Sequence, residues 1–229
     1  MKKSLIVLVS LAVIGVLGYA IVMYSPLTSL FNSQSNDSQN TTSLSVETKN
    51  IQDETDTYKI DVQYPQFGIS SVDARIQSAV QNVADGFKGY SPIPADSAAG
   101  KNQLTGIFDH VYIGDDYISF AQQFYEYTGG AHGNPSVGTL TFERTTNREL
   151  DITDLLDLTG LSLDQIATQA STTLAIKYGD AFWSDGTNPN AENYANFVVS
   201  TSTVTVIFNP YQVAPYAAGM PEVTFPRVK

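Results

Sequence analysis

The chain has 229 residues, no cysteine, two histidines and a formal net charge of −11 at pH 7. The absence of cysteine excludes disulfides, thiolate metal sites and a cysteine nucleophile, and two histidines leave few ligands for a zinc site. Nucleic acid is a poor candidate partner because its binding rests on lysine and arginine side chains, whereas an acidic chain suits a basic partner.

The first 24 residues are predicted to form a membrane anchor. Lys2 and Lys3 precede an uncharged apolar run over residues 5–23, which at ~1.5 Å per residue is long enough to cross the hydrocarbon core of a bilayer. The two lysines place the N-terminus in the cytoplasm and the rest of the chain outside the cell membrane. The alternative is a cleaved signal peptide and a secreted protein, because Gly-Tyr-Ala at 18–20 resembles a cleavage site. The apolar residues that follow it favour the retained anchor.

Residues 25–55 are predicted to be a disordered linker. Serine, asparagine, glutamine and threonine dominate this segment, and large apolar residues are almost missing from it. Such a composition cannot bury enough apolar surface to offset the entropy of ordering. We therefore expect a flexible stalk that holds a folded domain, residues 56–229, away from the membrane.

The folded domain is predicted to be α+β, with a mainly antiparallel sheet and two principal helices. Apolar and polar residues alternate over 58–64, which indicates a half-buried strand. The same reasoning predicts a long aromatic strand over 117–127 and a closing hairpin near the C-terminus. The other predicted strands cover 104–113, 136–143, 197–199, 204–208 and 222–225.

Two segments have the spacing of amphipathic helices. Apolar residues recur at helical spacing from Val72 to Phe87, and Ser71 is predicted to cap the helix N-terminus. A second helix is predicted over 162–178 and ends at Gly179. About 170 residues are enough for one core or for two packed lobes, which would cover about 56–135 and 136–229.

Three kinds of chemistry can be weighed against simpler interpretations. Asp151, Asp154 and Asp157 recur every three residues, but they are better explained by helix capping than by paired acid–base catalysis. The loop 185–193 offers oxygen ligands for calcium, although its glycine is second rather than sixth as in an EF-hand. His110 and His132 could meet a metal together with nearby carboxylates. An ordinary polar surface explains these residues better, so we predict no cofactor, metal or catalytic residue.

The stretch YEYTGGAHGNP, residues 125–135, is predicted to reverse the chain after the long strand, because glycine and asparagine tolerate positive φ. We expect His132 to shape this loop rather than to catalyse a reaction. Tyrosine is common at binding surfaces because it combines contact area with a hydrogen bond. The predicted ligand-binding residues are Tyr125, Tyr127, Gly129, Gly130, His132, Asn134, Tyr211 and Tyr216.

Two motifs, taken together and in this order, resemble a bacterial envelope family. The first comprises Tyr127, Gly129, Gly130, Ala131, His132 and Asn134, and the second comprises Pro210, Tyr211, Ala214, Pro215, Tyr216 and Gly219. The chain from residue 58 onward is similar to the domain of unknown function shared by the extracytoplasmic part of the anti-sigma factor RsiV and by PdaC-like peptidoglycan deacetylases.

The resemblance implies a sensing or binding domain. RsiV-like proteins bind lysozyme outside the membrane and release a sigma factor. From residue 55 this chain has 9 lysines and arginines against 19 aspartates and glutamates, a balance that suits a basic muramidase. Only residues 1–4 precede the predicted anchor, and the motifs end close to Lys229. We therefore expect neither sigma-factor binding nor deacetylation by this chain.

The expected function is that of a membrane-tethered, extracytoplasmic binding module of the cell envelope without catalysis. Its expected ligand is a cell-wall glycan or a basic envelope protein such as lysozyme. The alternative is an envelope hydrolase that acts on peptidoglycan or another polysaccharide through His132 and nearby carboxylates. A catalytic histidine should lie in a concave pocket beside a carboxylate, whereas a structural one should bond to the backbone on a loop.

Overall fold

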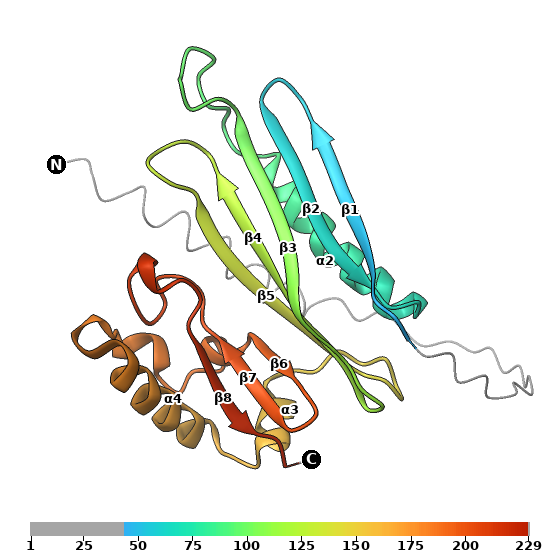
Figure 1. Ribbon diagram of the computed structural model, residues 1–229, viewed down its shortest axis with the longest axis vertical. Coiled ribbons are helices and arrows are strands. Elements are labelled where there is room, and N and C mark those ends of the chain that lie inside the picture. The colour runs from blue at the N-terminus through green and yellow to red at the C-terminus, as the bar shows by residue number, and fades with distance from the viewer. Residues whose placement is uncertain (1–43, 229) are drawn as a thin grey trace, which may run out of the picture. The chain divides into compact units, whose positions relative to one another are not determined.

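Two β-sheets and three α-helices make up most of residues 44–228, the part of the chain that the computed structural model describes (Figure 1). The predicted anchor, residues 1–24, and the predicted linker up to residue 43 lie outside this part. Within residues 44–228, no helix combines the length and apolarity needed to cross a bilayer. The mixture of helices with mainly antiparallel strands confirms the predicted α+β class.

Sheet A, the five-stranded sheet, has the strand order β1-β2-β3-β4-β5. Strands β2 and β3 are parallel and are connected through helix α2, whereas the other neighbouring pairs are antiparallel. A parallel pair requires such a crossover because the chain must return to the same end of the sheet. The elements are β1 (Glu47–Glu54), β2 (Tyr58–Gln66), α2 (Ser70–Phe87), β3 (Asn102–Ile113), β4 (Tyr117–Tyr127) and β5 (Asn134–Glu143).

Strand β1 falls within the predicted linker 25–55, so the folded domain begins earlier than predicted. Ile51 is the only large apolar residue of β1 and packs against the core of sheet A. The strand is held by antiparallel pairing with β2 along its whole length. Its composition is that of a charged edge strand, which is hard to distinguish from a polar linker in the sequence.

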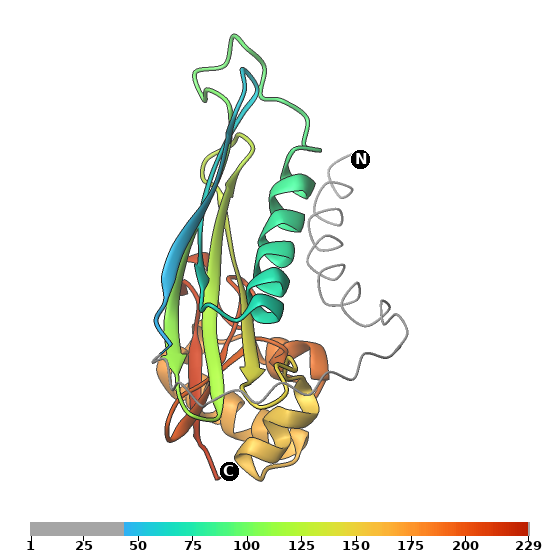
Figure 2. The same ribbon diagram turned by 90° about the vertical axis from the view of Figure 1, so that its right-hand side faces the viewer.

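Helix α2 covers one face of sheet A, as the side view shows (Figure 2). Its buried positions repeat every three to four residues, as predicted. The prediction that Ser71 caps this helix is wrong, because Ile69 occupies the N-cap position and gives no side-chain cap. Asp73 instead accepts hydrogen bonds from the backbone N–H of Phe67 (2.7 Å) and Gly68 (3.0 Å) and so fixes the turn before the helix. The buried helix residues are Val72, Ile76, Val80, Ala84 and Phe87.

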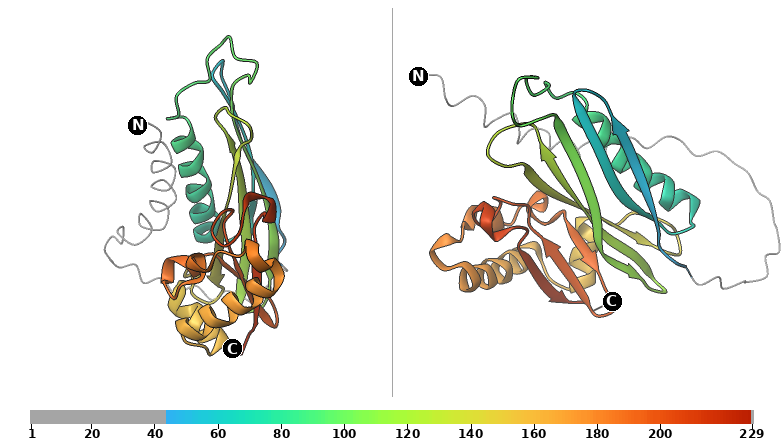
Figure 3. Two further views of the ribbon diagram at one scale, coloured as in Figure 1. Left: turned by 90° about the vertical axis from the view of Figure 1, so that its left-hand side faces the viewer. Right: turned by 45° about the horizontal axis from the view of Figure 1, so that its top comes forward.

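Sheet B is three-stranded, with the order β6-β7-β8, and shares a second core with helices α3 and α4. These elements lie on the β5 side of sheet A, away from β1 (Figure 3). They are α3 (Ile152–Thr159), α4 (Leu163–Tyr178), β6 (Phe197–Val199), β7 (Thr203–Ile207) and β8 (Glu222–Pro226), with 3-10 turns η1 (Gly179–Ala181), η2 (Ser184–Thr187), η3 (Ala191–Tyr194) and η4 (Tyr216–Ala218).

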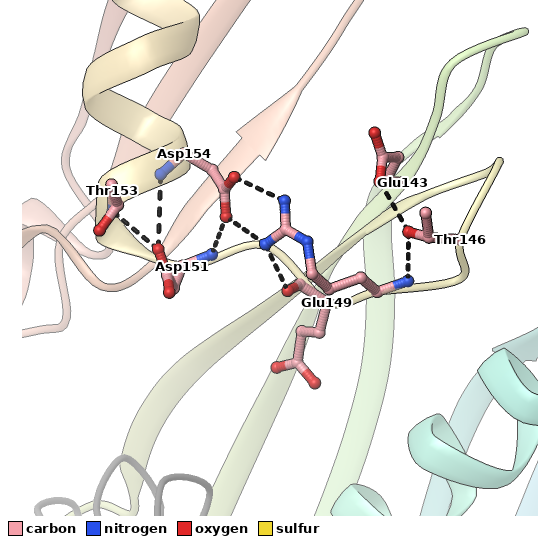
Figure 4. A network of polar contacts seen from close by, with 7 residues as sticks. Glu143, Thr146, Glu149, Asp151, Thr153 and Asp154 are labelled. Atoms are coloured by element: carbon pink, nitrogen blue, oxygen red, sulfur yellow. Dashed lines mark hydrogen bonds and ion pairs between the residues drawn. The ribbon is translucent and has the colours of Figure 1, made fainter. Parts of the chain in front are cut away.

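Helix α3 was not among the predicted helices, yet the predicted capping role of the acidic run holds for two of its residues. Asp151 is the N-cap and accepts from Thr153 N at 2.8 Å, while Asp154 accepts from Asp151 N at 2.8 Å (Figure 4). Arg148 donates two hydrogen bonds of 2.7 Å to the Asp154 carboxylate. This bidentate pair lowers the pKa of Asp154, and both carboxylates are therefore committed to the helix start.

Helix α4 agrees with the sequence prediction over 162–178. Ser162 forms the N-cap, Gly179 forms the C-cap, and Ile166, Ala170 and Leu174 are buried. The predicted division near residue 135 differs from the structure, because β5 pairs with β4 along its whole length and belongs to sheet A. The chain passes from sheet A to the second core only after Glu143.

Side-chain hydroxyls join the two sheets. Phe197 N donates to Thr139 Oγ1 at 2.8 Å, and Val199 N donates to Ser119 Oγ at 2.9 Å. Strand β6 pairs with β7 on its other side, so these bonds satisfy backbone groups of its unpaired edge. Thr141 adds a 2.7 Å bond to Ser119 and is itself buried. Strand β6 therefore lies against the face of β4 and β5 that α2 does not cover.

A histidine bridge forms a second link between the sheets. His110 lies at an irregularity in the β3–β4 pairing and has a φ of 52°. Its Nδ1 is 2.7 Å from Asp109 Oδ1, and its Nε2 is 3.2 Å from Glu222 Oε1 in β8. Burial lowers the pKa of His110, but the hydrogen bonds and charges of the two carboxylates outweigh it and leave the pKa above its ordinary value.

The hydroxyl link can be tested with Ser119→Ala, which removes the acceptor of the buried Val199 N–H. An unpaired buried donor costs about 1–3 kcal/mol, and we expect the free energy of unfolding to fall by that amount in urea denaturation of the full chain. Thr205→Ala is the control, because its hydroxyl pairs with Thr224 at the exposed surface and the expected change is below about 0.5 kcal/mol. Equal losses in both variants would contradict the role given to Ser119.

The histidine bridge predicts that stability falls as the pH rises. The folded-state pKa of His110 lies above the unfolded value of 6.5, so its contribution is complete below pH 6.5 and is lost as the pH rises through the folded pKa. A partly exposed pair contributes roughly 1 kcal/mol or less. The difference in unfolding free energy between the chain and His110→Gln should be largest near about pH 6 and shrink towards about pH 9. A difference that grows with pH would overturn this assignment.

Candidate functional site

The loop between β4 and β5 makes the sharp reversal that its sequence predicts. Gly129 and Gly130 have φ values of 95° and 106°, which side chains rarely adopt. Tyr127 Oη donates to Gly130 O at 3.3 Å. Gly133 N donates to Tyr125 Oη at 2.8 Å. Both tyrosine hydroxyls are therefore used within the loop, which they hold in one conformation.

His132 is exposed in this loop, two residues before β5, and bonds to the backbone. Its Nδ1 lies 2.8 Å from Gly133 O, as expected for a histidine that shapes the loop. Its ring packs against Tyr216, with centroids 4.3 Å apart and an interplanar angle of 30°. The structure thus brings the two sequence motifs, which are more than 70 residues apart, into direct contact.

The segment from Asn209 to Gly219, which carries Tyr211 and Tyr216, is held in place by hydrogen bonds. Val137 N in β5 donates to Asn209 Oδ1 at 2.9 Å, which ties the segment to sheet A. The Gln212 amide donates to Gly186 O and Asn193 O, each at 3.1 Å, and its oxygen accepts from Asn209 N, also at 3.1 Å. The loop 185–193 therefore uses two of its carbonyls to bind this segment.

Four aromatic rings contact one another in succession and are called the aromatic row here: Trp183, Tyr211, Tyr216 and His132. The Tyr216–Tyr211 centroids are 5.6 Å apart at 42°, and the Tyr211–Trp183 centroids are 6.3 Å apart at 12°. Trp183 is held by a 2.8 Å bond from its backbone N–H to Val213 O. Trp183 was not among the binding residues predicted from the sequence. The feature that could have pointed to it is that it is the only tryptophan in the chain.

The predicted binding residues divide into two groups. His132, Tyr211 and Tyr216 lie together in the aromatic row. The other five shape the loop beneath it through hydrogen bonds, positive φ values and strand pairing. This second group is Tyr125, Tyr127, Gly129, Gly130 and Asn134.

The acidic residues near the loop do not face His132. Among residues 44–228, no carboxylate oxygen lies within 4.0 Å of a His132 ring nitrogen, and no group of three His, Asp or Glu side chains could hold a metal ion. Glu126 bonds to Tyr90 Oη at 3.1 Å, and burial raises the pKa of its carboxyl. Strand alternation places Glu126 on the α2 face of β4, opposite Tyr125.

Comparisons with known proteins agree with this bipartite α+β domain. Residues 51–135 match the family model described as deacetylase PdaC, and residues 153–227 match the protein family of unknown function DUF3298. The chain is 24% identical over 163 residues to the peptidoglycan-N-acetylmuramic acid deacetylase PdaC of Bacillus subtilis (strain 168). The match covers 69% of this chain and 35% of that protein, so the chain spans about a third of its length.

Two crystal structures of DUF3298 family proteins share the fold. The protein from Pseudomonas aeruginosa PAO1 has a TM-score of 0.57 at 17% identity, with 80% of this chain and 90% of that chain covered. The protein from Bacteroides fragilis NCTC 9343 has a TM-score of 0.53 at 16% identity, with 82% and 92% covered. These matches confirm the resemblance to a DUF3298/PdaC-like domain family that the two motifs predicted.

The packing beneath His132 can be tested with Gly133→Ala. A Cβ at Gly133 would lie 2.5 Å from the Tyr125 ring and 2.7 Å from Glu126 O, which is backbone and cannot move aside. We expect the free energy of unfolding to fall by about 1–3 kcal/mol, as for other overpacked sites. Gly138→Ala in β5 is the control, since a Cβ there meets nothing within 4 Å. Two variants of equal stability in thermal denaturation would contradict this packing.

Proposed function

We propose that the chain is an extracytoplasmic binding module of the bacterial cell envelope, tethered to the membrane by its N-terminal segment and without catalysis of its own. Its ligand is a cell-wall glycan or a basic envelope protein such as lysozyme. The contact between His132 and Tyr216 carries the proposal, because it joins the two motifs of the family in one exposed surface.

The hydrogen bonding of this surface suits binding better than hydrolysis. His132 is exposed and directs Nδ1 to a backbone carbonyl, and the Tyr125 and Tyr127 hydroxyls are used within the loop. A general base needs a reacting group within reach and a partner that orients it, commonly a carboxylate. The contacts of His132 are those of a residue that shapes a loop, and no carboxylate of the described residues lies within 4.0 Å of its ring nitrogens.

Two observations support the two ligand classes. The relationship to a peptidoglycan deacetylase supports a wall glycan, and the aromatic row offers the ring faces that such a ligand contacts. The surplus of ten acidic residues from Thr55 onward supports a basic protein through electrostatic attraction. The two classes differ in how salt affects binding, because charge attraction is screened and ring stacking is not.

The proposal predicts saturable heat in calorimetric titration of the full chain with lysozyme or with soluble peptidoglycan fragments. Lysozyme binding should weaken steeply as salt rises, while fragment binding should change little. No binding of either ligand at low salt would refute the proposed function. His132→Ala is assayed in parallel for turnover of a wall substrate: a chain that hydrolyses it, with a variant that folds but does not, would establish the hydrolase instead.

A further inference from the structure

We infer that the aromatic row is a platform for a linear glycan, a chain of ring sugars that lies along Tyr216, Tyr211 and Trp183. The inference rests on the proposed function and specifies both the chemistry and the position of the ligand. It uses Trp183, which lies outside both sequence motifs.

Two neighbouring rings of the row are exposed to solvent. Trp183 is 41% exposed and Tyr211 is 49% exposed, although aromatic rings of this size are usually well buried. In the described part of the chain, the cation–π contacts are those of Lys177 with Tyr178 and of Arg227 with Tyr117. No lysine or arginine among the described residues therefore makes a cation–π contact with a ring of the row.

The row is built to hold these rings in place. Tyr211 has a φ of 65°, an unfavourable value for a residue with a side chain, and such strain persists only where the surroundings impose it. The neighbouring Gln212 imposes it through three hydrogen bonds. Gly186 lies so close to Gln212 that a Cβ added at Gly186 would be 1.9 Å from the Gln212 backbone oxygen. Binding to a preorganised platform avoids the cost of ordering its side chains.

The ring orientations distinguish among the ligands that aromatic faces bind. A cationic side chain is best held by rings that converge around one point, as in an aromatic cage. Here successive planes turn by only 12° to 42°, so the rings follow one another in a row and do not converge around one point. Nucleic-acid bases could stack along such a row. However, their binding requires a positively charged groove, and this chain has a net charge of −11.

A sugar chain can lie along a row of aromatic rings, and it does not need a positively charged groove. Its C–H face is apolar and slightly positive, and it complements the negative face of an aromatic ring. An uncharged sugar is not repelled by an acidic surface, and its hydroxyls point outward where water can satisfy them. The Tyr216–Tyr211 and Tyr211–Trp183 centroid steps are 5.6 and 6.3 Å, so three rings follow one another and more than one sugar unit can contact the row.

The test uses fluorescence of the full chain, because Trp183 is its only tryptophan and lies at one end of the row. The probes are N-acetylglucosamine and its linear oligomers of increasing length. We expect a saturable change in Trp183 emission whose affinity rises with oligomer length. Tyr211→Gly removes the central ring while its φ of 65° suits glycine, so the fold should persist. We expect this variant to lose about tenfold or more in affinity, as for a binding hot spot.

Asn147→Gly is the matched control, since Asn147 also has a positive φ (58°) but lies in the exposed turn after β5 and contributes no ring. It should bind like the unaltered chain. Equal affinity of Tyr211→Gly and Asn147→Gly would place the glycan elsewhere and overturn the inference. The inference also fails if no oligomer binds while lysozyme or peptidoglycan fragments do, and in that case the proposed function stands. If none of these ligands binds, both the inference and the proposed function are overturned.

Discussion

Hydrogen bonds from the backbone N–H groups of β6 to side-chain hydroxyls of sheet A are the interaction on which the rest of the structure depends. An unpaired strand edge normally needs another strand or water to satisfy its N–H groups. Ser119 and Thr139 supply the acceptors from the face of sheet A, so β6 can lie on that face without extending the sheet. The position of sheet B, and with it the meeting of His132 and Tyr216, follows from this arrangement.

The sequence predicted the parts of the fold whose signals are local. The alternation over 58–64 and the apolar spacing in 162–178 correspond to β2 and α4. Strand β1 was missed because its order comes from pairing with β2, which its own polar composition does not reveal. Helix α3 was missed because it is short and its acidic residues were interpreted without the Arg148 partner that fixes Asp154.

In the candidate site, too, the sequence predicted the residues whose signals are local. The glycines and His132 are recognisable as a turn from their sequence, and Tyr211 and Tyr216 were identified by resemblance to a family motif. Trp183 could not be assigned, because its place beside Tyr211 depends on the Gln212 amide reaching two separate carbonyls and on its own bond to Val213. Such contacts join segments that have no shared pattern in the sequence.

The position of β5 determines whether this domain can be divided between its two matched regions. The first family match ends at residue 135, the second begins at residue 153, and most of β5 lies in the interval between them. Yet β5 pairs with β4 of the first region and contributes Thr139 to the joint with β6 of the second. Each region would expose an unsatisfied strand edge without the other. The two matches therefore mark halves of a single folded unit, and a cut between them would separate strands that satisfy one another's backbone groups.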